Sequence, residues 1–377
     1  MKRAIALALT LILLTVTVTA EVPLSSKSAV LIEASTGTVL LERDPHQKLP
    51  PASVTKIMTM LLIAEAIDGG KIKMDDLVTC SDYASSMGGS QVYLKAGESM
   101  TVSDMLKAIA VASANDACVA MAEHLAGSES AFVAQMNERA AALGMKNTKF
   151  CNTNGLPDPN HLTTAYDIAL MSKELIKHEK ILPYLGIWTD SLRGGDFGLA
   201  NTNKLIRYYK GANGIKTGST NDAGFCLSAA ALREGMQLIA VVLGAPTSKE
   251  RFADATALLD YGFANYEIGR GVESGEVLAN LPVTKGSAAE VALVPQKEFA
   301  PLLKKGQGAS MTSVTEIPET VAAPVEAGQE LGQLRFLVGE QEIGSLPLVA
   351  ADKVEKRKMG ASFSLLCRSW VVAKRKI

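Results

Sequence analysis

The feature that most constrains this chain is a lysine at the head of an apolar run. Lys56 is followed by "IMTMLLIAEAID" and then by Gly69-Gly70. A run this apolar predicts a buried helix of roughly four turns that ends at the glycine pair. Because an unpaired charge is very costly to bury, the ammonium group of Lys56 must be paired, neutralised or used in chemistry.

Ser53 lies three residues before Lys56, and positions three apart share one face of a helix. A serine hydroxyl is a weak nucleophile until a base removes its proton. A lysine in apolar surroundings is a candidate base, because burial disfavours its charged form. The helix start adds backbone N–H groups near any developing negative charge. The spacing is common by chance, and the alternative is a helix N-cap serine beside a surface lysine.

Strand-forming and helix-forming segments divide the first 266 residues. "AVLIEASTGTVLLER" predicts a hairpin that turns at residues 35–37, and residues 102–180 are rich in Ala, Met and Leu at helical spacing. Residues 211–246 predict three antiparallel strands, followed by a helix from about Lys249 to Phe263. We therefore expect an α/β domain over residues 21–266, with a sheet assembled from both ends of this segment and a helical cluster between them.

Residues 267–350 have a different composition. Short runs rich in Val and Leu are broken by Pro, Gly and Lys, as in "EVLANLPVTKG" and "GQLRFLVGEQEIGSLPLVA". This pattern predicts a second, small all-β domain. Residues 306–327 give no clear pattern, so the strand order of this domain stays open.

The N-terminal segment, residues 1–20, is typical of a secretory signal peptide. Lys2 and Arg3 precede an apolar stretch that ends in the small residues of "VTA". The alternative is an uncleaved membrane anchor. Either one predicts that the protein is exported.

Residues 351–377 predict a basic amphipathic helix that lies on a membrane surface. From residue 353 onward the segment carries eight Lys or Arg and one Glu, and apolar residues recur at alternating steps of four and three. Arg368 and the short length argue against a helix that spans the bilayer. The alternative is a solvated basic tail. The apolar residues are Met359, Phe363, Leu366, Trp370, Ala373 and Ile377.

Charge and metal-ligand spacing argue against several partners. The formal net charge of −1 offers no global field for nucleic acid. The four histidines and five cysteines show no metal-ligand spacing, so we expect neither a metal nor another cofactor. The odd number of cysteines leaves disulfides and buried reduced thiols as open alternatives.

Two further motifs support a catalytic Ser53. Ser113-Ala114-Asn115 places two polar side chains in an otherwise apolar helical block, where their burial needs a reason. Lys216-Thr217-Gly218 lies on a predicted strand, where the glycine lets a ligand approach the backbone and Lys with Thr suits a carboxylate. Three such motifs in this order are the signature of the penicillin-recognising serine enzymes.

With these motifs, the chain resembles the low-molecular-mass penicillin-binding proteins, specifically the D-alanyl-D-alanine carboxypeptidases of peptidase family S11. The likeness runs from about Ser26 to the tail and includes "PPASVTKIMT", "ASANDACVAMAEH", "NTNGLPDPNHLTTAYDIALMSKEL" and "NGIKTGSTNDAGFCLSAAA". It implies a penicillin-binding/β-lactamase-like α/β domain, a small C-terminal all-β domain, and an amphipathic helix on the outer face of the cytoplasmic membrane. The implied activity removes the terminal D-alanine from peptidoglycan stem pentapeptides, and β-lactam antibiotics acylate the same serine.

The resemblance also implies a role for each motif residue. Ser53 is expected to be the acylated nucleophile, with Lys56 as its general base. Ser113 is expected to relay protons, and Asn115 to hold the substrate amide. The backbone N–H groups of Ser53 and Ser219 are expected to form the oxyanion hole.

The terminal carboxylate of the peptide is expected to bind at the third motif. Lys216 and Thr217 would contact it, with Gly218 allowing the close approach. Arg251 matches a family position thought to assist with this carboxylate, and the alternative is a plain surface arginine. Some relatives carry His where this chain has Ser219, which bears on reaction rates more than on identity.

Three other functions share some of these features. A class A β-lactamase needs a deacylating Glu in an E-x-x-L-N segment, which we do not find, and lacks the extra β domain and basic tail. A related esterase would normally carry Tyr in place of Ser113. A non-catalytic penicillin-binding sensor would acylate without turnover, and turnover of a D-Ala-D-Ala peptide distinguishes it from the enzyme.

Overall fold

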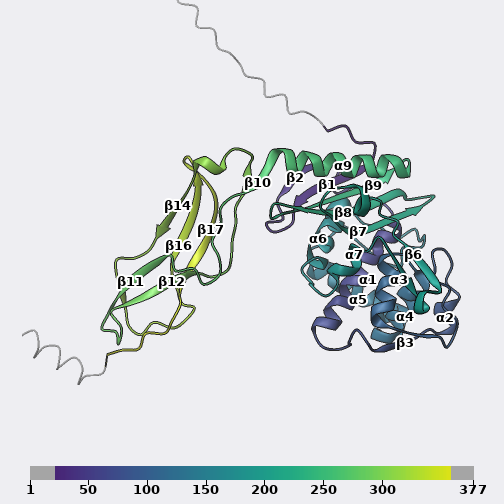
Figure 1. Ribbon diagram of the computed structural model, residues 1–377, viewed down its shortest axis with the longest axis horizontal. Helices are drawn as coiled ribbons and strands as arrows, with labels where there is room; N and C mark the ends of the chain where they lie inside the picture. The colour runs from purple at the N-terminus through teal and green to yellow at the C-terminus, as the bar shows by residue number, and fades with distance from the viewer. Residues whose placement is uncertain (1–21, 358–377) are drawn as a thin grey trace, which may run out of the picture.

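The computed structural model describes residues 22–357, which form two bodies that meet near residue 266 (Figure 1). The expected signal peptide, residues 1–20, lies outside the described residues, as do residues 358–377 of the expected C-terminal helix. Within the described range, no helix combines the length and apolar character needed to cross a membrane.

The first body is built on a five-stranded antiparallel sheet with strand order β2-β1-β9-β8-β7. As expected, an N-terminal hairpin and a later three-strand meander combine in one sheet. The turn between β8 and β9 places Glu234 and Gly235 at positive φ, as a two-residue hairpin turn requires. The strands are β1 (Ser28–Glu33), β2 (Val39–Arg43), β7 (Ala212–Thr220), β8 (Gly224–Arg233) and β9 (Met236–Ala245).

Helices cover both faces of this sheet, so its strands are apolar along their length. Helix α9 (Ser248–Asn265) packs on one face against β8 and β9, above the sheet in Figure 1. Helix α6 (Ala165–Leu175) packs on the other face against β1 and β9, and it contacts α1 (Lys56–Asp68). Strand β1 is buried at every position as a result.

A helical cluster surrounds α1, which contacts α3, α4, α5 and α6. Because neighbours surround it, α1 is apolar on nearly every side, as its sequence predicted. The other elements here are α2 (Asp82–Ser85), α3 (Val102–Ala110), α4 (Asn115–Ala126), α5 (Glu129–Ala142), α7 (Leu182–Leu185), α8 (Leu205–Tyr208), β3 (Leu77–Thr79), β4 (Ser99–Thr101), β5 (Thr189–Leu192) and β6 (Phe197–Ala200).

The second body is all-β, as expected, and has its own core. Its six-stranded sheet has the order β14-β16-β17-β12-β11-β15, and β10 pairs with β13 beside it. The buried apolar side chains between these strands form a cluster separate from those of the first body. The strands are β10 (Tyr266–Ile268), β11 (Ala279–Thr284), β12 (Glu290–Pro295), β13 (Leu302–Lys304), β14 (Met311–Glu316), β15 (Val321–Ala322), β16 (Glu330–Val338) and β17 (Gln341–Ala350).

The expected start of the C-terminal helix at residue 351 is wrong. Val354 is buried in the core of the second body and bridges to Val325, and Lys356 bridges to Gly286. Residues 351–357 therefore extend the all-β body, because the apolar side chain of Val354 fills its core.

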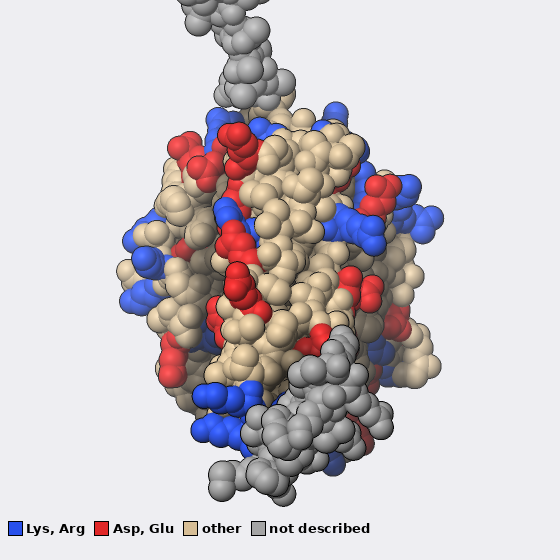
Figure 2. Space-filling view, turned by 90° about the vertical axis from the view of Figure 1, so that its left-hand side faces the viewer, with Lys and Arg blue, Asp and Glu red and all other residues tan. Residues whose placement is uncertain are grey.

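The end of the molecule formed by the second body carries charges of both signs. Figure 2 shows acidic and basic side chains interspersed around a broad uncharged area on this face. On the described part of this face, charges of both signs lie close together, so their fields largely cancel at a distance.

Four cysteines lie in the described part of the chain, and all four are free thiols. Cys80, Cys118 and Cys226 are buried, and Cys151 is partly buried. The structure therefore has reduced thiols, not disulfides, at these four positions. Cys367 lies outside the described range.

Candidate active site

Ser53 and Lys56 are in contact, as their spacing predicted. Ser53 lies in a short 3₁₀ turn (Ala52–Thr55) that runs directly into α1, and Lys56 is the first residue of that helix. In a 3₁₀ turn side chains three residues apart eclipse one another. Lys56 Nζ therefore lies 2.9 Å from Ser53 Oγ.

Lys56 is fully buried, and this burial changes its acid–base behaviour. Loss of hydration disfavours the ammonium form and lowers the pKa of Lys56 to about 8, although Cys118 and Asp116 act in the opposite direction. The alternative of a surface lysine is therefore wrong. A lysine with this pKa is partly neutral near pH 7 and can accept a proton.

Lys56 has a second partner that the sequence motifs do not include. Its Nζ donates to the backbone carbonyl of Asn154, 2.7 Å away. Asn154 lies in the loop after α5, where the Oδ1 atom of Asn152 accepts from the N–H of Gly155 at 2.7 Å. The turn-forming composition of "NTNGLPDP" marks a loop, but nothing in it indicates that the loop carbonyl contacts Lys56.

Ser113 lies in the connection between α3 and α4, not within a helix. Its backbone has a φ of 61°, a left-handed conformation that is uncommon for a residue other than glycine. The side chain is buried, and its hydroxyl has no hydrogen-bond partner among the described residues. Such strain with an unsatisfied polar atom is typical of functional positions.

Asn115 starts α4 and holds a neighbouring loop. Its Nδ2 donates to the carbonyl of Gly88 at 2.7 Å, and its backbone N–H donates to the carbonyl of Ser90 at 2.8 Å. The side-chain oxygen Oδ1 is buried and accepts no hydrogen bond from the described residues. It is therefore available to an N–H donor from a bound peptide.

Asp116, the next residue, was missed by the sequence reasoning. Its carboxylate is fully buried and accepts from the backbone N–H groups of Val92 and Leu94, the latter at 3.0 Å. Asn115 and Asp116 thus fix the loop of residues 88–94 against the start of α4. The signal in the sequence was an Asp directly after the second motif, within an otherwise apolar helical block.

The third motif lies on the edge strand β7. Lys216 and Thr217 are buried, and Lys216 Nζ donates to the carbonyl of Thr217 at 3.2 Å. Burial first, and then the nearby charge of Lys56, hold the pKa of Lys216 well below its usual value. The Thr217 hydroxyl is hydrogen-bonded to the hydroxyl of Thr202. Ser219 follows on the same strand and is exposed.

Gly218 brings β7 against the backbone of Ser53 and Val54. A Cβ atom at this position would lie 2.8 Å from the backbone nitrogen of Ser53 and 2.9 Å from that of Val54. Any other residue would force the strand away from the turn. The glycine therefore sets the distance between β7 and Ser53, and the close approach of a ligand that we expected at this position stays a prediction.

Arg251 is buried, so the surface alternative for it is wrong. Its Nη1 donates to the carbonyls of Gly218 at 3.2 Å and Cys226 at 3.3 Å, which joins α9 to β7 and β8. The guanidinium also lies over the ring of Phe252, 4.5 Å from its centroid. Burial lowers the pKa of Arg251 to about 10. Through these hydrogen bonds Arg251 holds the third motif in position from the α9 side of the sheet.

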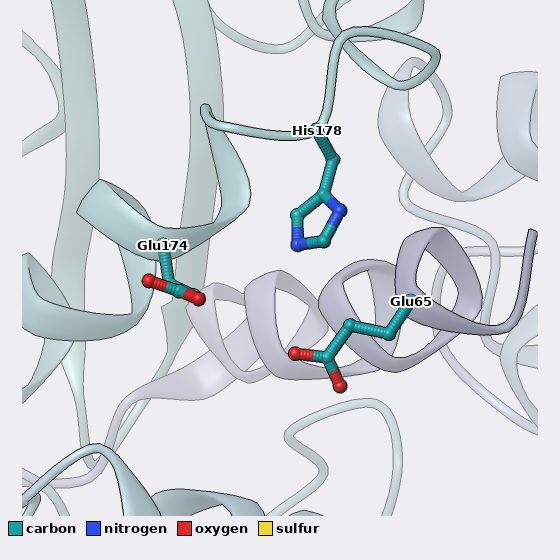
Figure 3. Close-up of side chains that lie close together, drawn as sticks. All are labelled: Glu65, Glu174 and His178. Atoms are coloured by element: carbon teal, nitrogen blue, oxygen red, sulfur yellow. The ribbon is translucent and has the colours of Figure 1, made fainter. Parts of the chain in front are cut away.

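A separate cluster on the helical side offers three possible metal-ligand atoms. Figure 3 shows the side chains of Glu65, Glu174 and His178 pointing toward one another. Their ligand atoms all lie within 4.8 Å of one another. Arg139 donates to both carboxylates, at 2.7 Å to Glu65 and 3.0 Å to Glu174. His178 Nδ1 is 2.7 Å from a carboxylate oxygen of Asp68. Because the guanidinium occupies the space between the carboxylates, we interpret the cluster as an ion-pair network that ties α1 to α5 and α6.

Comparison with known proteins agrees with this geometry. The family model described as D-alanyl-D-alanine carboxypeptidase, peptidase family S11, matches residues 15–247, and that of the penicillin-binding protein 5 C-terminal domain matches residues 266–356. D-alanyl-D-alanine carboxypeptidase DacF of Bacillus subtilis is 45% identical over 341 residues, covering 89% of this chain and 88% of the relative. DacC of Escherichia coli is 33% identical, covering 88% and 85%.

Solved structures show the same fold across both bodies. Penicillin binding protein 5 from Haemophilus influenzae superposes with a TM-score of 0.79 at 30% identity, covering 89% of this chain and 98% of that one. Penicillin binding protein 6B from Escherichia coli gives a TM-score of 0.71 at 30% identity, covering 87% and 96%. The expected fold, a penicillin-binding-like α/β domain with a C-terminal all-β domain, is confirmed. The chain belongs to peptidase family S11, the serine-type D-alanyl-D-alanine carboxypeptidases.

Proposed function

We propose that Ser53 is the nucleophile of this carboxypeptidase and Lys56 its general base. The observation that carries the proposal is the 2.9 Å contact between Lys56 Nζ and Ser53 Oγ at a lysine whose pKa lies near 8. The carbonyl of Asn154 accepts one N–H of Lys56, which turns the remaining face of the neutral amine toward the serine hydroxyl. The proton of Ser53 then has an acceptor in place before substrate binds.

The reaction follows from these positions in two steps. Ser53 Oγ attacks the carbonyl between the last two D-alanines while its proton passes to Lys56, and the C–N bond breaks as the proton reaches the leaving amine. Water then attacks the ester, releases the shortened peptide and restores Ser53. The backbone N–H groups of Ser53 and Ser219 stabilise the oxyanion in both steps.

The remaining motif residues bind the peptide and move protons. Ser113, whose buried hydroxyl has no described partner, relays the proton toward the leaving amine. Asn115 accepts from a peptide N–H through its free Oδ1. Lys216 and Thr217 bind the terminal carboxylate, and Arg251 holds the backbone carbonyl of Gly218 behind them. β-Lactams, which carry a carboxylate and a reactive carbonyl at similar spacing, acylate the same serine.

Mass spectrometry after treatment with penicillin tests the assignment of Ser53. We expect a single adduct on the peptide that contains Ser53, and none in the Ser53→Ala variant. An adduct on a different residue would overturn the assignment.

We further propose that successive segments of the chain have separate roles. Residues 21–266 form the catalytic domain, residues 267–357 support it as a small β-rich domain, and residues 1–20 direct export to the outer side of the cytoplasmic membrane. The basic, amphipathic pattern of residues 358–377 supports peripheral attachment to that membrane.

Sedimentation with anionic lipid vesicles tests the attachment. Trp370→Glu removes a large apolar group from the stripe and adds a negative charge, so we expect the variant to remain largely in the supernatant. Val314→Glu, at an exposed position of the second body, makes a comparable change elsewhere and should sediment like the unmodified protein. Equal sedimentation of both variants would contradict the proposed anchor.

A further inference from the structure

Glu129 holds the loop that contacts Lys56, although it belongs to none of the three motifs. It is the first residue of α5, and Ser128 caps this helix by accepting from the N–H of Ala131. The positive end of the helix dipole favours a carboxylate at this place. The side chain of Glu129 is partly buried and reaches across to Thr153.

One carboxylate oxygen of Glu129 binds a single loop residue twice. Oε1 accepts from the backbone N–H of Thr153 at 3.0 Å and from its hydroxyl at 2.8 Å. Thr153 is completely buried, and a buried donor that loses its acceptor is costly. The loop is therefore held at Thr153 from the start of a helix, which is a more rigid support than another loop would be.

The other side of this loop segment faces α1. The carbonyl of Thr153 accepts from the hydroxyl of Thr59 at 2.6 Å, and the carbonyl of Asn154 accepts from Lys56 Nζ at 2.7 Å. Residues 153 and 154 thus lie between the Glu129 carboxylate and α1. Because they are adjacent, a shift at Thr153 also moves the carbonyl that binds Lys56.

A contact with Tyr83 fixes the orientation of the Glu129 carboxylate. Its Oε2 accepts from the hydroxyl of Tyr83, in α2, at 2.8 Å. This bond is the main reason why the pKa of Tyr83 lies above its usual value, so the phenol stays the donor. With one oxygen on α2 and the other on the loop, the carboxylate cannot rotate without breaking hydrogen bonds.

We propose that Glu129 is a positioning residue of this enzyme: by holding Thr153, it keeps the carbonyl of Asn154 against Lys56 and so directs the amine of Lys56 toward Ser53. The inference rests on the proposed function, because it takes Lys56 as the base. Within the described residues, Glu129 is hydrogen-bonded to the loop and to α2 and not to Lys56, so it acts through the loop.

The pH profile of acylation by fluorescent penicillin tests the proposal on the full chain in detergent. A carbonyl acceptor stabilises the ammonium form of Lys56, so its displacement in Glu129→Ala should lower the pH of half-maximal rate by about half a unit. The plateau rate should fall about tenfold, because the amine is no longer held toward the serine. The variant leaves unchanged the other ionisable groups beside Lys56, which are Asp116 and Cys118 on α4 and Lys216 on β7.

Two further substitutions at Glu129 separate its hydrogen bonds from its charge. Glu129→Gln removes the charge but keeps a carbonyl oxygen that can accept both bonds from Thr153, so its profile should match that of the unmodified protein. Glu129→Asp keeps the charge at the start of the helix but shortens the side chain by one methylene. Its carboxylate should no longer reach Thr153, so the profile should shift in the same direction as in Glu129→Ala.

A matched variant on the same helix separates positioning from general stability. Asn137 also ties α5 to this loop, through two hydrogen bonds with the backbone of Phe150, but it acts four residues before Asn154. Asn137→Ala should lower the melting temperature, because these bonds are lost, and should leave the pH of half-maximal rate unchanged.

Three results would overturn the inference. They are an unchanged profile in Glu129→Ala or Glu129→Asp, a shifted profile in Glu129→Gln, and a shift in Asn137→Ala as large as that in Glu129→Ala. In each case a rate that rises toward about pH 8 in the unmodified protein would leave the proposed function standing. A flat profile in the unmodified protein would overturn Lys56 as the base and the inference with it.

Discussion

At the scale of single residues, burial dominates the chemistry of Lys56. Two features stabilise its charged form, the nearby Asp116 and Cys118, yet the loss of hydration is larger and sets the pKa near 8. Lys216 is buried as deeply and also has a lowered pKa, but its amine is directed to the carbonyl of Thr217. Geometry, not acidity alone, therefore distinguishes Lys56, the proposed base, from Lys216, the proposed carboxylate ligand.

The first prediction concerns the pH dependence of acylation. A protonated Lys56 cannot accept the Ser53 proton, so the rate of acylation by fluorescent penicillin should rise about tenfold per pH unit below about pH 8 and level off above it. Lys56→Ala should reduce the rate by about 10²–10⁴-fold across the range. A flat profile between pH 6 and 9 in the unmodified protein would exclude Lys56 as the base.

The second prediction concerns His161, which is buried and hydrogen-bonded in its neutral form. Burial lowers its pKa from about 6.5 to about 4, so the unfolded chain binds more protons between these values. The stability that neutral His161 provides is full above pH 6.5 and is lost as the pH falls toward 4. The loss between pH 7 and pH 5 should be about 2 kcal/mol.

Urea unfolding followed by tryptophan fluorescence, at pH 7 and pH 5, measures this loss. His161→Gln keeps a donor and an acceptor but does not titrate, so the free energy of unfolding of the variant should depend less on pH. Equal losses in both proteins would show that other groups account for the acid sensitivity.

At the scale of elements, the site depends on two close backbone approaches to one turn and on a hydrogen bond from the lysine that follows it. β7 reaches the turn through Gly218, the loop after α5 reaches it through Gly155, and Asn154 of the same loop binds Lys56. These contacts fix Lys56, Ser53 and β7 relative to one another.

The third prediction compares two glycines at positive φ. Gly155→Ala places a Cβ against the carbonyl of Ala52, so the loop must move, and we expect the acylation rate to fall at least about tenfold. Gly144→Ala has the same backbone strain but no atom within 4 Å of the new Cβ. It should cost about 1 kcal/mol of stability and leave acylation intact. Similar acylation rates in the two variants would contradict the role of the loop.

Elements with strong periodicity could be predicted from the sequence, and their contacts with distant loops could not. The apolar run after Lys56 and the strands of residues 211–246 formed as expected, because each local pattern agrees with its final burial. The contact of Lys56 with Asn154 joins residues 98 apart, and no local pattern encodes it. The positive φ of Ser113 could not be predicted either, because serine has no preference for that conformation.

At the scale of the whole molecule, the core of the second body shares no buried residue with the two core clusters of the first body. The order of the two bodies was evident from the change in composition near residue 267. The strand order of the second body was not, since the β12–β17 and β11–β15 pairings join segments far apart in sequence. The role of Val354 was missed for the same reason. It pairs with Val325 of the second body, whereas the sequence pattern placed it in the C-terminal helix.

The fourth prediction follows from the separate cores. Phe336 is fully buried in the second body and packs against Phe299, so Phe336→Ala should destabilise that body by about 3–5 kcal/mol. The rate at which Ser53 is acylated should stay unchanged. Phe132→Ala, in the core beside α1, should instead lower both the melting temperature of the first body and the acylation rate. Loss of acylation in Phe336→Ala would mean that the bodies are energetically coupled.

The measurement that tests the central claim most directly is release of free D-alanine from Nα,Nε-diacetyl-L-Lys-D-Ala-D-Ala. The purified full chain is compared with its Ser53→Ala variant, and both are treated in parallel with fluorescent penicillin. We predict that the unmodified protein releases D-alanine with turnover and that the variant neither releases it nor takes up the label. Labelling of Ser53 without any D-alanine release would contradict the account and favour a non-catalytic penicillin-binding sensor.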